Sequence, residues 1–109
     1  MSALSKVLRE GPGGVLIFRC PGCNDSHAIN HGAGPGPRWG WNGNADKPTF
    51  TPSVLVRYGA NPDADEEFKE WRTERVCHSF VTDGRIQFLT DSTHELAGQT
   101  VDLPEWPPQ

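Results

Sequence analysis

The sequence lacks long apolar runs, and it lacks an excess of positive charge. No stretch approaches the roughly 20 apolar residues that a membrane-spanning helix requires. The N-terminal stretch MSALSKVLREGPGG contains no apolar segment of signal-peptide length. The formal net charge of −4 at pH 7 provides no basic field for a phosphate backbone. We therefore expect a cytoplasmic protein whose main partner is neither a membrane nor a nucleic acid.

Cysteine is scarce, and its number is odd. Two of the three cysteines lie in CPGC, residues 20–23, a spacing more typical of metal or redox chemistry than of a secreted disulfide framework. Glycine and proline are abundant instead, with 12 and 10 residues among 109, and they indicate many turns and few long helices. A chain of this length forms one modest core. We predict a single domain over residues 1–109, with its core in residues 15–104 and flexible ends.

Short β-rich runs are the main elements that the sequence contains. GGVLIFRC predicts a buried strand that ends at Cys20, TFTPSVLVRY predicts a strand with Pro52 at an edge or a bend, and TVDL predicts an edge strand. In the loop-rich stretch 30–48, Trp39 and Trp41 are expected to anchor the core or to line a groove for an extended peptide. The stretch NPDADEEFKEWRTER predicts one short amphipathic helix.

The segment VCHSFVTDGRIQFLT predicts a β-hairpin. Its two β-rich runs flank Asp83-Gly84, a dipeptide that suits a two-residue type I′ turn. With such a turn, His78 faces Leu89, and the neighbouring Cys77 points to the opposite face of the strand. The elements together predict an α+β, β-rich fold with a small twisted antiparallel sheet, one short helix and a zinc knuckle.

The motif CPGC directly after a strand has the form of a zinc knuckle, which aims two thiolates at one ion. A tetrahedral zinc site needs further ligands, and Cys77 is the only other thiol in the sequence. We predict a structural Zn²⁺ bound by Cys20, Cys23, Cys77 and His94, with His27 as the second choice for the fourth ligand. The alternative is that Cys20 and Cys23 are reduced or redox-active thiols. The absence of a βαβ context favours zinc.

Four stretches together resemble a family of small phage and prophage proteins of unknown function: FRCPGC…H, WNG…PTFTPSVL, CHSFVTDGRIQFL and DSTHELAGQTVDLP. The resemblance covers residues 15–104. Family members often carry the label ammonia monooxygenase, but that chemistry belongs to a membrane-embedded copper enzyme, and this sequence has no membrane segment. Some relatives are encoded beside bacterial ubiquitin-like conjugation genes and have been proposed to cleave the ubiquitin-like protein. The resemblance thus implies a peptidase in the bacterial host cytoplasm with a protein or peptide partner.

The stretch DSTHELAG carries residue types that a serine peptidase needs. The resemblance implies Ser or Cys at the position of Ser92. Both are acyl-transfer nucleophiles, although a Cys there can equally be a fourth zinc ligand. We predict Ser92 as the nucleophile, His78 or His94 as the base, and Asp91 as the carboxylate that orients His78.

Other interpretations of these residues stay open. Ser92 with Glu95 matches a capping box, in which Ser92 is the N-cap of one helical turn. Ser53 and Ser79 are rival nucleophiles. The leading function is therefore a zinc-binding serine-type peptidase that acts on a ubiquitin-like or other small phage or host protein. The runner-up is a non-catalytic zinc-stabilised module that binds a protein partner, and a third possibility is a zinc-dependent hydrolase with an open metal position.

Overall fold

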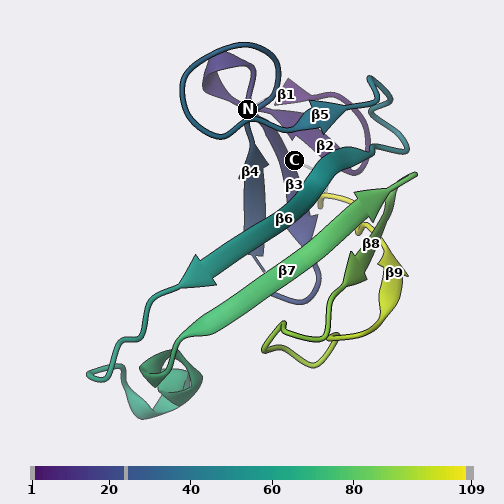
Figure 1. Ribbon diagram of the computed structural model, residues 1–109. Helices are drawn as coiled ribbons and strands as arrows, with labels where there is room; N and C mark the ends of the chain where they lie inside the picture. The colour runs from purple at the N-terminus through teal and green to yellow at the C-terminus, as the bar shows by residue number, and fades with distance from the viewer. Residues whose placement is uncertain (1, 24, 108–109) are drawn as a thin grey trace.

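The computed structural model describes residues 2–23 and 25–107 and consists mostly of antiparallel strands in two sheets (Figure 1). The first sheet has the order β1-β2-β3-β4, and the second has the order β5-β6-β7-β8-β9. The strands of the first sheet are β1 (Ser2–Ala3), β2 (Leu8–Glu10), β3 (Leu16–Cys20) and β4 (Asp25–Ile29). Those of the second sheet are β5 (Gly40–Trp41), β6 (Phe50–Tyr58), β7 (Arg75–Thr82), β8 (Arg85–Phe88) and β9 (Thr100–Asp102).

Two 3-10 helices, η1 (Pro12–Gly14) and η2 (Glu66–Arg72), complete the described elements. The helix expected from the sequence is η2, which links β6 to β7 at one end of the second sheet (Figure 1). The rings of Phe68 and Trp71 stack with their centroids 4.5 Å apart, as their shared face predicts. The helix buries none of its residues. No helix in the described part of the chain is long and apolar enough to span a membrane.

The prediction of a β-rich, antiparallel fold with one short helix in the expected segment and a cysteine knuckle is confirmed. The expected apolar face of the helix is not buried: η2 is a 3-10 helix, interrupted at Phe68, whose residues are all exposed. The strands divide into two sheets, whereas the sequence suggested one. The chain leaves the first sheet at Ile29 and enters the second at Gly40, through a stretch whose glycines and prolines interrupt regular strand pairing.

A shared apolar core lies between the two sheets. Every second residue of β3 is buried, and the rings of Phe18 and Phe50 stack with their centroids 6.0 Å apart, which joins the first sheet to the second. In β7 the buried residues are Cys77, Ser79 and Val81. Because successive strand residues point to opposite faces, β7 directs its other side chains away from this core.

The predicted hairpin is confirmed as β7 and β8. Asp83 and Gly84 have φ values of 50° and 78°, as both central residues of a type I′ turn require. The backbone N–H of Leu89 donates to the carbonyl oxygen of His78 over 2.9 Å, so these two residues face each other as expected. Cys77 is buried and His78 lies on the opposite face, and the predicted edge strand near the C-terminus is β9.

Candidate active site and metal centre

A chain of hydrogen bonds joins a serine, a histidine and an aspartate on the outward face of the second sheet. The Nδ1 atom of His78 lies 3.0 Å from Oδ2 and 3.2 Å from Oδ1 of Asp91. Its Nε2 atom lies 2.9 Å from the hydroxyl oxygen of Ser53. An ionised carboxylate only accepts hydrogen bonds, so Nδ1 carries a proton and Nε2 of the neutral ring accepts from Ser53. This geometry suits transfer of the serine proton to the imidazole.

The positions of these three residues follow from strand pairing. Leu55 of β6 is the direct partner of His78 on β7, and the register shifts between Phe50 and Val54. Ser53 lies in that irregular stretch, where the chain departs from regular alternation and the serine hydroxyl reaches the imidazole. After β8 the chain continues beside β7, with hydrogen bonds from Leu89 to His78, and this course brings Asp91 to the other edge of the same ring.

Ser92, the expected nucleophile, lies in a different environment. Its hydroxyl accepts from the backbone N–H of His78 over 3.0 Å and donates to the backbone carbonyl of His78 over 3.1 Å. The side chain is only 8% exposed, and it makes no hydrogen bond to the imidazole in the described residues. Ser92 therefore holds the backbone of β7 in place, and its hydroxyl does not serve as the N-cap that the capping-box pattern suggested. Ser79 is buried on the core side of β7.

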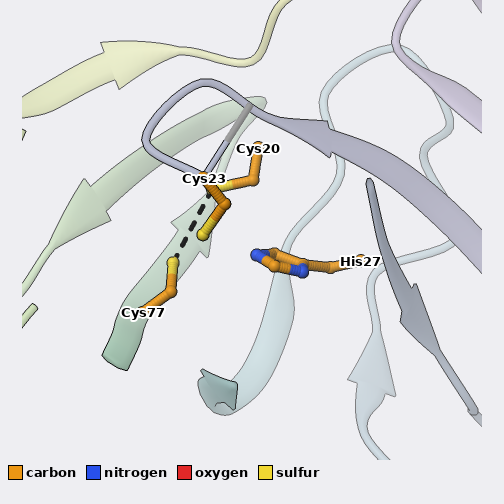
Figure 2. A group of neighbouring side chains, drawn as sticks. All are labelled: Cys20, Cys23, His27 and Cys77. Atoms are coloured by element: carbon orange, nitrogen blue, oxygen red, sulfur yellow. Dashed lines mark hydrogen bonds between the residues drawn. The ribbon is translucent and has the colours of Figure 1, made fainter. Parts of the chain in front are cut away.

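The cysteines of the knuckle meet Cys77 on the inner face of β7. The ligand atoms of Cys20, Cys23, His27 and Cys77 all lie within 4.8 Å of one another. Figure 2 shows the three sulfur atoms together, with the imidazole of His27 pointing toward them. Cys20, His27 and Cys77 are 1%, 4% and 1% exposed. The Nε2 atom of His27 is buried without a hydrogen-bond partner among the described residues, which suits a metal ligand.

Hydrogen bonding within the cluster favours a thiolate. The side chains of Cys23 and Cys77 hydrogen-bond to Cys20 and lower its pKa to about 3. Hydrogen bonding to Cys20 raises the pKa of Cys77, and burial raises it further. The Sγ atoms of Cys20 and Cys77 are 3.7 Å apart, and all three cysteines are free thiols. This partly anionic set of three sulfurs and one imidazole, buried except for the half-buried Cys23, matches the ligand chemistry of a tetrahedral zinc site.

His94, the first choice for the fourth ligand, is not part of this cluster. Its ring packs edge-on against Phe88, with the centroids 4.4 Å apart, and its Nδ1 accepts from the backbone N–H of Leu96 over 3.2 Å. The ring also lies against the knuckle, because a Cβ atom at Gly22 would overlap it. The histidine that joins the cysteines is His27, the second choice.

The position of His27 has a simple cause. β3 and β4 form a hairpin around the knuckle, and Phe18 is the direct partner of His27. Directly opposed residues share a face of the sheet, so His27 points inward with Phe18 and Cys20. In the sequence, three residues separate Cys23 from His27, and this short spacing was the signal for His27 as a metal ligand.

The family model described as "Bacterial ubiquitination-like system serine protease (BubE)" matches residues 3–89. The matched segment contains Ser53, His78 and the four clustered Cys and His residues, and it ends two positions before Asp91. No curated protein and no solved structure matches the chain.

Proposed function

Because the chain belongs to the family of bacterial ubiquitination-like system serine proteases, we propose that it is a serine peptidase with Ser53 as its nucleophile. His78 is the general base and Asp91 orients it. The observation that carries this proposal is the unbroken hydrogen-bonded chain from the Ser53 hydroxyl through both ring nitrogens of His78 to the Asp91 carboxylate. The same constellation of groups performs acyl transfer on unrelated folds.

In this mechanism the Ser53 oxygen attacks the carbonyl carbon of the scissile bond while its proton passes to Nε2 of His78. Asp91 keeps the proton on Nδ1 and stabilises the imidazolium ion. The imidazolium then protonates the leaving amine, and an ester to Ser53 remains. Water attacks this ester, with His78 taking its proton, and releases the carboxylate product and the free serine.

The cluster of Cys20, Cys23, His27 and Cys77 is proposed to bind one Zn²⁺ as a structural ion. Four protein ligands complete a tetrahedral shell and leave no position for a reactive water molecule. The cluster faces the core, whereas His78 faces outward from the same strand. Both features argue against the zinc-hydrolase alternative. The ion would hold β3 and β4 to β7 and so support the strand that carries the base.

The proposed substrate is a protein of a bacterial ubiquitin-like system, cut in an extended segment. The family description supports a protein partner, and the outward position of Ser53 and His78 leaves them accessible to one. The alternative of a non-catalytic binding module predicts binding without turnover.

The test is reaction with an alkyl fluorophosphonate, which labels activated serines, together with cleavage of ubiquitin-like fusion proteins followed by mass spectrometry. We expect the wild-type protein to be labelled at Ser53, and Ser53→Ala to lose both labelling and cleavage while its melting temperature stays unchanged. Ser26→Ala, at an exposed serine on β4, is the matched control and should react like the wild type. Labelling at Ser92 instead, or wild-type protein that neither labels nor cleaves, would contradict the assignment.

A further inference from the structure

Two exposed apolar side chains lie beside the proposed nucleophile. Leu55 is 43% exposed and Phe80 is 42% exposed, which places them among the five large apolar residues that are most exposed in the described part of the chain. Both lie on the outward face of the second sheet, which also carries His78. The outward face of an antiparallel sheet is usually polar where it meets water, so this pair needs an explanation.

Leu55 is placed directly against the base. It is the cross-strand partner of His78. The backbone N–H and carbonyl of His78 are bonded to Ser92 and Leu89, which lie on the side away from β6. Leu55 and His78 therefore form a non-hydrogen-bonded pair, in which the side chains of an antiparallel pair lie closest. The leucine side chain forms one wall beside the imidazole.

Phe80 is placed on the other side of the nucleophile. It lies two residues after His78 on β7 and shares its face. Val54 pairs with Ser79, and because the strands are antiparallel, Ser53 and Phe80 are the next residues on β6 and β7. The Ser53 hydroxyl thus lies between an exposed leucine and an exposed phenylalanine.

The apolar character of this face is confined to the active site. Apart from Pro52, which directly precedes Ser53, the other exposed positions of β6, β7 and β8 carry polar side chains: Thr51, Arg57, Thr82, Arg85 and Gln87. On the β8 side, His78 borders a hollow of about 470 Å³, also lined by Gln87, Phe88, Leu89, Thr90, Asp91 and Gly98. An extended chain that crosses Ser53 therefore meets the apolar surface of Leu55 and Phe80 on one side of the imidazole and a hollow with a mixed polar and apolar lining on the other.

We propose that Leu55 and Phe80 form a specificity surface, which selects an apolar side chain on the substrate residue whose carbonyl Ser53 attacks. That side chain begins only two bonds from the attacked carbon, so it lies within reach of Leu55 and Phe80 when Ser53 attacks. When this substrate side chain is buried, its own apolar surface and those of Leu55 and Phe80 are all removed from water. The inference rests on the proposed peptidase function and adds to it a preference for Leu, Ile, Val, Met or Phe at this residue.

The test uses aminoalkyl diphenyl phosphonates that carry a leucine-like, phenylalanine-like, lysine-like or aspartate-like side chain. The Ser53 oxygen forms a bond to phosphorus, phenolate leaves, and the serine proton passes to His78. We expect the two apolar reagents to react at least tenfold faster than the two charged ones. A single methylene in an apolar pocket is worth about 10- to 200-fold, and a charged side chain against the same surface also loses hydration. Leu55→Ser and Phe80→Ser should each reduce this ratio severalfold, and Leu55→Met and Phe80→Leu should retain it.

Leu4→Ser is the matched control, because Leu4 is 39% exposed and lies between β1 and β2. It should keep the wild-type ratio. Equal reaction of apolar and charged reagents at a labelled Ser53 would overturn the specificity surface and leave the peptidase function standing. An equal loss of rate for all four reagents in Leu55→Ser and Phe80→Ser would also overturn the specificity surface, because such a loss would indicate that the two residues have a structural role. Failure of the alkyl fluorophosphonate to label Ser53 would overturn the peptidase function itself.

Discussion

The two serines beside His78 differ in the hydrogen-bond partners of their hydroxyl groups. The hydroxyl of Ser92 is bonded to a backbone N–H and a backbone carbonyl, and neither group can take its proton. The hydroxyl of Ser53 is 2.9 Å from Nε2 of the His78 imidazole, and this nitrogen can accept the serine proton. Asp91 determines the state of that nitrogen, because a carboxylate at Nδ1 keeps the proton there and leaves Nε2 free to accept.

Replacing Asp91 by Asn tests this dependence on the tautomer. An amide at the same position can donate to Nδ1, which moves the ring proton to Nε2 and removes the acceptor for the serine proton. We expect Asp91→Asn to lower the rate of fluorophosphonate labelling by about 10³- to 10⁴-fold. Asp91 has a side chain that is 58% exposed, so the melting temperature should change little. A labelling rate within tenfold of the wild type would show that Asp91 does not orient the base.

At the scale of an element, β7 carries two proposed sites on its two faces. Cys77 points toward the knuckle, and the adjacent His78 points to Ser53 and Asp91. The alternation of a strand separates the two residues chemically even though they are neighbours in sequence. A change on one face should therefore spare the direct contacts of the other.

Two substitutions in β7 test this separation. Cys77→Ser should lose bound zinc and lower the melting temperature, because it removes a metal ligand from the core. His78→Ala should retain near-stoichiometric zinc and most of the stability, but it should lose labelling at Ser53. Metal content, thermal unfolding and labelling measured on the same preparations provide the comparison. Equal loss of zinc in both variants would show that the two faces are not independent.

At the scale of the whole molecule, the proposed metal centre joins the two sheets. Its residues come from β3, the knuckle and β4 on one side and from β7 on the other. A chain of 109 residues buries only a modest core, and chains of this size gain substantially from a structural metal. The single-domain boundary at residues 1–109 stays a prediction, which limited proteolysis with and without metal can test.

Removal of the metal is expected to unfold the protein or to lower its stability strongly. Protein purified without added zinc should contain close to one zinc ion per chain. A strong chelator should then reduce the melting temperature, because binding free energies of structural zinc are on the order of 10 kcal/mol and appear as folding free energy. Added zinc should restore both the melting temperature and labelling at Ser53. Metal-free protein with an unchanged melting temperature would contradict the structural role.

Features that depend on neighbouring residues were predictable from the sequence alone. The knuckle, the hairpin turn at Asp83-Gly84 and the opposite directions of Cys77 and His78 depend on local turn geometry and on strand alternation. His78, Asp91 and three cysteines were accordingly recognised as candidates. The predicted pairing of His78 with Leu89 agrees with their hydrogen bond, because the turn length sets the register of a hairpin.

The partners of these residues were decided only by the tertiary structure. The contact between Ser53 and His78 joins residues 25 apart in sequence, and it depends on an irregular register between β6 and β7 that no local pattern specifies. The choice of His27 over His94 likewise depends on how β4 pairs with β3 and on how both meet β7. A shift of one residue in either pairing would turn these side chains to the opposite face. The sequence by itself therefore determined which residue types were available, and the pairing of distant strands determined which of them meet.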